Sequence, residues 1–288
     1  MYCNANRSHI RFAPNSFKYL TFLLLDPRMG SFQKASTTWI GSQQTLSSAD
    51  SIDEALGVTH YSAEYQPIVG LNSQQVFAYE ALARFYNVNQ APVSPISVFQ
   101  ALHSNSKLLG RAELQLKWLQ IAAAPANTHL FINLDPHALT EEVRSSMLEL
   151  LTPDKRLVVE LIENSDLQDS HASMMLLESL HEQGISSALD DIGASESMLS
   201  IDLMVAVDYM KFDRRWVALL DEPDYERLFR HLLTFARASG RKTVLEGVET
   251  EAQLMRLQDY PLDFVQGFLY RTQFLSSPRF ELELGWDH

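Results

Sequence analysis

The chain is poor in cysteine and in basic residues. Of its 288 residues only Cys3 is a cysteine, which excludes an internal disulfide framework and a zinc site built from cysteines. Lys and Arg number 23 against 36 Asp and Glu, giving a formal net charge of −13. We therefore expect no DNA- or RNA-binding surface. The near absence of cysteine also fits a reducing compartment, and we expect a cytoplasmic location.

Long apolar segments are also missing. No stretch reaches the roughly 18–20 residues that a membrane-spanning helix needs, so we expect no membrane span. The nearest candidate, Phe17 to Leu25, contains Lys18 and ends at Asp26. It has the basic flank of a signal peptide but no clear small-residue cleavage site, which favours a short extension packed on the domain or a poorly ordered tail.

The composition changes at about residue 60. Residues 31–51 are rich in Ser, Thr and Gln and show little periodicity, as expected of a linker or flexible arm. We predict that residues 1–60 form an N-terminal extension or linker of unknown role and that residues 61–288 form one domain.

Several common catalytic patterns are absent. The sequence contains no glycine-rich nucleotide loop, no P-loop, no internal repeat and no Gly-x-Ser-x-Gly elbow. The nine histidines show no metal-ligand spacing, and we expect His129 and His137 on the surface or in loops. Serine or cysteine nucleophiles and a histidine-metal hydrolase therefore have no support.

What the chain does have is a succession of short apolar runs separated by helical patterns. Hydrophobic residues make up 46%, enough for a sizeable core. Residues 64–70 and 76–82 read as two strands joined by a short link, which predicts an antiparallel hairpin. Further strands are predicted around Leu130, Leu157, Ser187, Tyr209, Thr243 and Phe264, with helices at 111–119, from an N-cap at Thr140, and at 174–181, 198–204, 225–238 and 251–257.

This alternation indicates the fold class. About eight strands with intervening helices are most economically arranged as a (β/α)8 TIM-like barrel, here with an irregular, antiparallel first strand. A doubly wound open sheet is the alternative fold.

Each predicted strand after the first carries, at or near its end, a side chain able to bind a metal ion or a phosphate. The set is Glu80, Asn133, Glu160, Asp190, Asp191, Lys211, Glu246 and Gln266. Taken singly, each has an ordinary explanation, such as a turn for the two aspartates or a salt bridge for the lysine. In a barrel, however, the strand ends surround one pocket. The complete set therefore favours a shared site.

The chemistry of this set points to divalent cations. Carboxylate and amide oxygens suit Mg²⁺ or Mn²⁺ better than structural zinc. Five carboxylates in one pocket would repel one another strongly without cations. Two ions about 3.5–4 Å apart would neutralise them, activate a water and stabilise phosphodiester cleavage. Lys211 is then expected to position the water or counter phosphate charge, and Arg84 to hold a phosphate oxygen.

The segments around these residues resemble a known family. In chain order they are Tyr65–Val69, Tyr79–Arg84, Ile132–Pro136, Glu160–Glu163, Asp190–Gly193, Lys211–Asp213, Glu246–Thr250 and Gln266–Leu269. Together they are similar to the EAL-type cyclic-di-GMP phosphodiesterases of bacteria. The resemblance implies a modified TIM barrel with an antiparallel first strand. It also implies hydrolysis of cyclic di-GMP to linear pGpG with Mg²⁺ or Mn²⁺, which lowers the level of this second messenger.

The resemblance also implies a role for each site residue. Glu80, Asn133, Glu160, Asp190 and Asp191 look like metal ligands, with Glu80 essential for catalysis. Lys211 and Glu246 look like the residues that orient or deprotonate the attacking water, and Gln266 lies near the metal and the water. Gln66 and Arg84 look like substrate contacts, and Glu163 is similar to the glutamate that anchors the loop after Asp191.

That loop departs from the family pattern. The family usually reads Asp-Asp-Phe-Gly-Thr-Gly, whereas this chain has Ala194 and Ser195 at the last two positions and Ile162 where a threonine is common. Alanine cannot make the threonine's hydrogen bond, and serine is stiffer than glycine. In relatives this loop helps to place a metal-binding aspartate and contributes to dimerisation, so a homodimer is compatible with the sequence. A weakened or inactive cyclic-di-GMP receptor or protein-interaction module is the alternative function, although the intact carboxylates favour an enzyme.

Overall fold

The computed structural model describes residues 57–162, 167–195 and 199–282 of the chain. The predicted extension lies outside these ranges up to residue 56. The strands are β1 Val58–Gly70, β2 Val76–Asn87, β3 Pro92–Val93, β4 His129–Asn133, β5 Leu157–Ile162, β6 Ser186–Ile192, β7 Tyr209–Phe212, β8 Lys242–Leu245, β9 Phe264–Gln266, β10 Leu275–Ser276 and β11 Phe280–Glu281. The helices are α2 Pro95–Leu102, α3 Ser106–Ala122, α4 Arg144–Leu151, α5 Leu167–Glu182, α6 Ile201–Ala206, α7 Arg215–Leu219, α8 Pro223–Ala238 and α9 Glu251–Leu257, with the short 3-10 helices η1 Pro136–Ala138 and η2 Phe268–Gln273.

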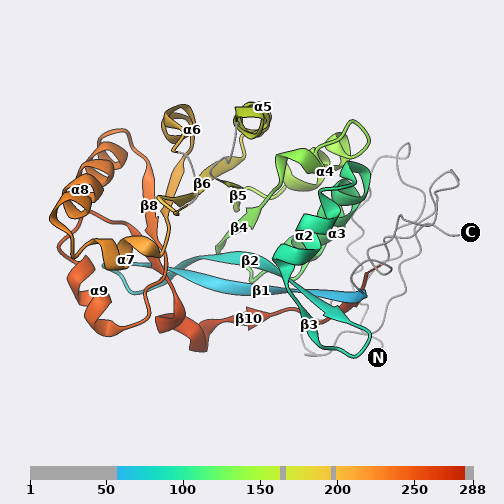
Figure 1. The fold of residues 1–288 in the computed structure, drawn as a ribbon, viewed down its shortest axis with the longest axis horizontal. Coiled ribbons are helices and arrows are strands. Elements are labelled where there is room, and N and C mark those ends of the chain that lie inside the picture. The colour runs from blue at the N-terminus through green and yellow to red at the C-terminus, as the bar shows by residue number, and fades with distance from the viewer. Residues whose placement is uncertain (1–56, 163–166, 196–198, 283–288) are drawn as a thin grey trace, which may run out of the picture. The chain divides into compact units, whose positions relative to one another are not determined.

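Strands β1, β2 and β4 to β9 close into an eight-stranded barrel. Neighbouring strands from β2 through β4 to β9 run parallel to one another. Strand β1 is antiparallel to both of its barrel neighbours, with Gln66 opposite Glu80 on β2 and Ile68 opposite Gln266 on β9. Figure 1 shows the two long strands β1 and β2 side by side. The predicted barrel with an antiparallel first strand is confirmed, and the doubly wound open sheet is wrong.

Two layers of side chains fill the inside of the barrel, because side chains alternate between the two faces of a strand. The lower layer, which we call the apolar floor, consists of the fully buried Ile68, Ala78, Phe131, Val158, Ala188 and Val244, packed with Phe77, Tyr209 and Phe264. The next inward position lies two residues further along each parallel strand. Those positions carry Glu80, Asn133, Glu160, Asp190, Lys211, Glu246 and Gln266, which we call the polar layer. On the antiparallel β1, the matching step back from Ile68 reaches Gln66.

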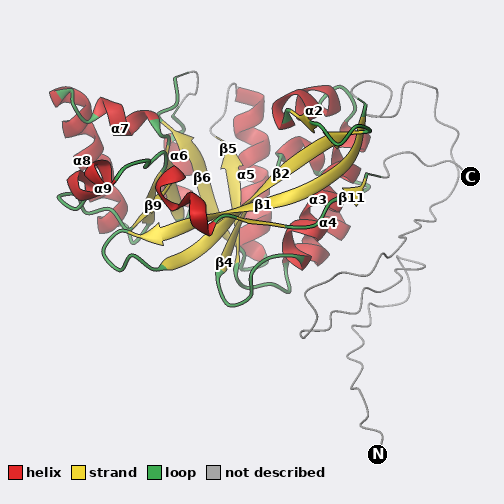
Figure 2. Ribbon diagram, turned by 90° about the horizontal axis from the view of Figure 1, so that it is seen from below, coloured by secondary structure: helices red, strands yellow, loops and turns green. Residues whose placement is uncertain are grey.

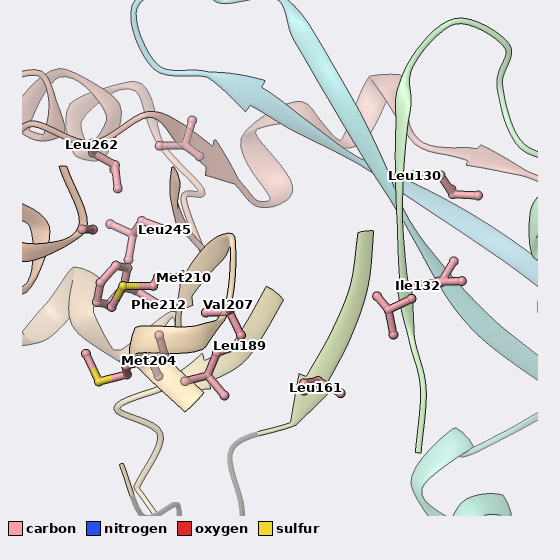
Figure 3. Close-up of a cluster of buried hydrophobic side chains, with 14 of the residues drawn as sticks. Leu130, Ile132, Leu161, Leu189, Met204, Val207, Met210, Phe212, Leu245 and Leu262 are labelled. Carbon is pink, nitrogen blue, oxygen red and sulfur yellow. The ribbon is translucent and has the colours of Figure 1, made fainter. Parts of the chain in front are cut away.

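The intervening residues face outward and form the main core beneath the helices. Figure 3 shows Ile132, Leu161, Leu189, Met210 and Leu245 in this position. The helices supply matching apolar faces. Helix α8, for example, buries Phe229, Leu233 and Ala236, which recur with the spacing of one helical face. Figure 2 shows helices such as α3, α4 and α5 beside the strands.

Most predicted elements are present, but the helix expected from Thr140 is wrong at its start. Helix α4 begins at Arg144. The carbonyl of Thr140 instead accepts hydrogen bonds from the N–H groups of Val143 (3.2 Å) and Arg144 (3.0 Å). Thr140 therefore closes a turn through its backbone and does not cap the helix through its side chain. Helix α6 also begins later than predicted, at Ile201, after an N-cap at Ser200.

The two histidines predicted to be surface or loop residues differ from each other. His137 is exposed in η1, as expected. His129 lies in β4, and its ring stacks on Phe77 with the centroids 4.7 Å apart. His129 therefore packs against the apolar floor. Within the described residues, none of the helices has the length and apolar character needed to cross a membrane.

Candidate active site

Lys211 lies at the centre of the polar layer and is fully buried. Its Nζ atom contacts Glu160 Oε1 at 2.5 Å, Asp190 Oδ1 at 2.8 Å, Glu246 Oε1 at 2.8 Å and Glu80 Oε2 at 3.6 Å. Burial opposes the charge of Lys211, but these four carboxylates together raise its pKa well above the usual value. The lysine is therefore a charged partner shared by four strand-end groups, and one positive charge cannot neutralise them all.

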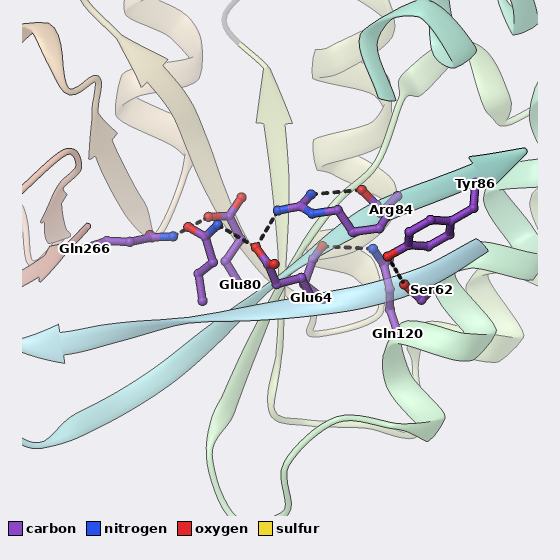
Figure 4. Close-up of polar contacts among 10 residues, drawn as sticks. Ser62, Glu64, Glu80, Arg84, Tyr86, Gln120 and Gln266 are labelled. Atoms are coloured by element: carbon purple, nitrogen blue, oxygen red, sulfur yellow. Dashed lines mark hydrogen bonds and ion pairs between the residues drawn. The ribbon is translucent and has the colours of Figure 1, made fainter. Parts of the chain in front are cut away.

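Glu80 is held by amides from the two strands that flank the β1–β2 hairpin. Its Oε1 atom accepts a hydrogen bond from Asn133 Nδ2 (3.2 Å), and its Oε2 atom accepts one from Gln266 Nε2 (2.6 Å). Figure 4 shows Glu80 and Gln266 facing each other. Burial raises the pKa of Glu80, but the charge of Lys211 and these hydrogen bonds outweigh it, so that the pKa is lowered. Glu80 is therefore the carboxylate best prepared to be ionised.

The other carboxylates hold their protons more tightly. Burial, and then the charge of Glu80, raises the pKa of Glu160 well above the usual value. Burial raises the pKa of Glu246 to about 8, against the pull of Lys211, and burial together with the charge of Asp190 raises that of Asp191 to about 6. Such groups release their protons readily only when a cation takes the protons' place.

The carboxylates form two overlapping groups of three. Glu80, Glu160 and Asp190 make one, and Asp190, Asp191 and Glu246 make the other; within each, one ligand atom per residue lies within 4.8 Å of the rest. Among the described residues, no donor reaches Glu160 Oε2 or Gln266 Oε1 by a hydrogen bond. Oxygen donors with unused lone pairs fit hard divalent cations such as Mg²⁺ or Mn²⁺. Because Asp190 belongs to both groups, the donor set fits two neighbouring ions.

The turn after β6 carries Asp191 in an unusual conformation. Asp191 has a φ of 56°, a left-handed value that aspartate tolerates better than most residues. The turn is closed by a hydrogen bond from Ala194 N–H to the carbonyl of Asp191 at 3.0 Å. The turn therefore forms with alanine at position 194, without a threonine side chain there.

Trp216 on α7 supports this turn and was not among the predicted site residues. Its indole Nε1 donates a hydrogen bond to the carbonyl of Ile192 at 2.7 Å. A Cβ atom at Gly193 (φ 87°) would lie only 2.4 Å from the same nitrogen, so glycine is required for this close approach. The only signal in the sequence is a buried tryptophan shortly after Lys211, which is too general to predict the contact.

The two expected substrate contacts lie beside the carboxylate cluster, on the hairpin. Arg84 Nη2 donates to Glu64 Oε1 at 2.6 Å (Figure 4). Gln66 Nε2 donates to the same oxygen at 3.1 Å. The Arg84 and Glu64 side chains are 30% and 29% exposed, so solvent reaches this pair. Glu64 was not among the predicted site residues. Glu163 falls outside the described residues, and its anchoring role stays a prediction.

The comparisons with known proteins identify the family of this chain. The model of the EAL domain family matches residues 49–273. The chain therefore belongs to the EAL domain family.

Curated relatives include named phosphodiesterases. The chain is 27% identical over 245 residues to the cyclic di-GMP phosphodiesterase NbdA of Pseudomonas aeruginosa, covering 80% of this chain and 31% of NbdA. It is 28% identical over 233 residues to the probable cyclic di-GMP phosphodiesterase PdeB of Escherichia coli, covering 76% of this chain and 44% of PdeB. The chain thus spans about a third to a half of the length of these relatives.

Solved EAL structures share the fold. An EAL domain protein from Listeria monocytogenes superposes with a TM-score of 0.61 at 21% identity, covering 73% of this chain and 87% of that one. A manganese and cyclic-di-GMP complex of Klebsiella pneumoniae BlrP1 gives 0.61 at 24% identity, covering 73% and 55%. At these identities the likeness supports the barrel fold.

Proposed function

We propose that this protein is a metal-dependent phosphodiesterase that hydrolyses cyclic di-GMP to linear pGpG in the bacterial cytoplasm. The observation that carries the proposal is the polar layer around the buried Lys211. Its carboxylates belong to two sets of three side chains, and Asp190 is a member of both sets. A module that only binds its ligand has no chemical need for so many buried carboxylates, which burial makes costly to ionise. Membership of a family with phosphodiesterase relatives supports the same conclusion.

The first group of residues in the site is proposed to bind the metal ions. Glu80, Asn133, Glu160, Asp190 and Asp191 would hold Mg²⁺ or Mn²⁺, as two ions. When bound, these ions would supply the charge neutralisation and water activation that phosphodiester cleavage requires.

Lys211 is proposed to orient the attacking water, and Glu246 to take up its proton. The lysine Nζ lies 2.8 Å from Glu246 Oε1, and the Glu246 side chain is 22% exposed, so it lies where solvent can reach it. Arg84 and Gln66 are proposed to exchange their shared contact with Glu64 for the phosphate and the rest of the dinucleotide. Arginine suits this exchange because its guanidinium group can grip a phosphate with two hydrogen bonds.

A direct assay tests the function. Purified protein is incubated with cyclic di-GMP and either Mg²⁺ or Mn²⁺, and pGpG is measured by chromatography. We expect turnover in the wild type and none in Glu80→Ala, which removes a ligand and leaves two amides without their acceptor. The matched control is Glu178→Ala, an exposed glutamate on α5, which should retain the wild-type rate. Binding of cyclic di-GMP without turnover under both metals would show a receptor instead.

A further inference from the structure

A second group of metal-ligating side chains lies outside the polar layer. It consists of His103, Asp135 and His137, one ligand atom of each lying within 4.8 Å of the others. His103 is the C-cap residue of α2, Asp135 is the N-cap residue of η1 just after β4, and His137 lies within η1. The fold thus brings His103 next to two residues that lie more than thirty positions further along the sequence.

The two imidazoles approach opposite oxygens of one carboxylate. His103 Nε2 lies 2.7 Å from Asp135 Oδ2, and His137 Nδ1 lies 3.2 Å from Asp135 Oδ1. The two rings are 5.7 Å apart between centroids. Two ligands of a tetrahedral ion, each about 2.0–2.1 Å from it, are about 3.3 Å apart. The His137–Asp135 distance of 3.2 Å is already close to that value. The His103–Asp135 distance of 2.7 Å has to open by about 0.6 Å to admit an ion, which rotation of the exposed His103 side chain would allow.

The carboxylate at the centre is held in place by its surroundings. Asp135 Oδ1 accepts a hydrogen bond from the backbone N–H of His137 at 2.9 Å, and the side chain is only 14% exposed. Helix α3 packs tightly on η1 at Gly110, where an added Cβ would lie 2.7 Å from the carbonyl of Ala138. Hydrogen-bonded carboxylates on packed elements are the usual support of a metal site.

The histidine side chains leave the outer side of the group open. They are 47% and 44% exposed, so water can complete the coordination of an ion. Imidazole nitrogen favours Zn²⁺, Co²⁺ or Ni²⁺ over Mg²⁺, which prefers oxygen. This preference differs from that of the polar layer, whose donors are carboxylates and amides.

We infer that His103, Asp135 and His137 form a second metal site, which binds a late divalent transition metal of the Zn²⁺ class. An ion there ties the turn between α2 and α3 to the loop that follows β4. That loop begins directly after Asn133, so the ion stabilises the rim of the barrel beside the polar layer. The site is independent of whether the barrel hydrolyses cyclic di-GMP.

The test uses the full chain stripped of metal and titrated with Zn²⁺ in competition with a coloured chelator. A parallel titration with Co²⁺ reads the visible absorption of an ion with imidazole ligands. We expect His103→Gln and His137→Gln each to weaken Zn²⁺ binding by at least about 10- to 100-fold, since even supporting residues cost this much. The Co²⁺ absorption of this site should be lost with them. Zn²⁺ should also raise the Tm of the wild type and leave that of these variants unchanged.

Two control variants separate this site from other parts of the chain. His231→Gln changes an exposed histidine on α8 and should bind Zn²⁺ like the wild type. Asp191→Asn changes the carboxylate group that Asp191 forms with Asp190 and Glu246 and should keep the Co²⁺ absorption of the histidine site. The inference is overturned if His103→Gln and His137→Gln bind Zn²⁺ as tightly as the wild type with the same Co²⁺ spectrum. Both positions are nearly half exposed, so glutamine should leave the fold intact, which circular dichroism will verify.

Discussion

The apolar floor and the polar layer lie on the same strands, only two residues apart, yet they meet opposite physical demands. The floor buries Phe131, Val158 and Val244 fully and without charge, which stabilises the barrel through the hydrophobic effect. The polar layer buries Glu160 and Lys211 just as completely, and burial holds the pKa of the glutamate well above its usual value. One step of the strand repeat therefore separates the part of the barrel that supports folding from the part suited to chemistry.

The largest expected effect comes from neutralising the polar layer. In Glu160→Gln we expect turnover of cyclic di-GMP to fall by roughly 10³-fold or more, because a buried ligand loses its charge. The metal-free Tm should stay close to that of the wild type, since the raised pKa already keeps Glu160 protonated without metal. Rate assays and thermal unfolding in a chelator measure the two effects. A large fall in the metal-free Tm would show that the polar layer also supports folding.

The reverse pattern is expected for the floor. Phe131→Ala should lower the free energy of unfolding by about 3–5 kcal/mol through the cavity that it leaves. The rate per folded molecule should change far less than in Glu160→Gln. Urea unfolding gives the free energy, and the exposed Phe268→Ala is the size-matched control, expected within about 1 kcal/mol of the wild type. Equal losses from both phenylalanines would contradict the assignment of the floor.

The third prediction concerns pH. The pKa of Asp191 is raised to about 6 and that of Glu246 to about 8, both above the ordinary values of about 4. Between about pH 4 and 8 the unfolded chain has released protons that the folded protein retains, so the metal-free protein should lose stability as pH rises. Each such proton changes the free energy of unfolding by about 1.4 kcal/mol per pH unit where the difference is complete.

The measurement is the Tm of metal-free protein from pH 5 to pH 8, with and without Mn²⁺. We expect the Tm to fall across this range without metal, and Mn²⁺ to restore more stability at pH 8 than at pH 5. Glu246→Gln should flatten the upper part of the curve. A metal-free Tm that rises from pH 6 to pH 8 would contradict the assigned pKa shifts.

The smallest expected effect comes from the support behind Asp191. Trp216→Phe keeps the ring but removes the hydrogen bond to the carbonyl of Ile192, which should cost about 0.5–1.5 kcal/mol of stability. We also expect weaker Mn²⁺ binding, because Asp191 directly precedes Ile192 in the turn that this hydrogen bond supports. Titration with Mn²⁺ measures the affinity. Trp216→Ala, which also removes the buried ring, should change stability more than metal affinity. Unchanged Mn²⁺ binding in Trp216→Phe would mean that the turn keeps its conformation without the hydrogen bond from Trp216.

The sequence predicted the barrel and the polar layer because both follow from a local repeat. The run Leu157-Val158-Val159-Glu160 places Val158 in the floor and Glu160 above it, and the same spacing recurs in the other parallel strands. The start of α4 was not predictable in this way. Thr140 is a favourable N-cap residue, but the chain takes a turn there before the helix begins at Arg144.

Contacts between distant segments could not be predicted from the sequence either. His137 lies two residues after Asp135, but His103 is far from both in the sequence, and the fold places it beside Asp135. The same holds for Trp216, whose role depends on the path of the turn after Asp191. The contact of Glu64 on β1 with Arg84 on β2 requires the register of the hairpin. Patterns within one strand were readable, whereas contacts between elements were not.

Lys211 gives the barrel a resident cation. Because its ammonium group already contacts four carboxylates, we expect the barrel to fold around these carboxylates without any divalent ion. Small zinc domains, by contrast, fold only when their metal arrives. We therefore expect chain folding and metal loading to be separate events in this protein. A cell short of Mg²⁺ or Mn²⁺ would then contain folded, metal-free and inactive protein. Metal binding would activate this protein when the ion supply recovered, without new protein synthesis.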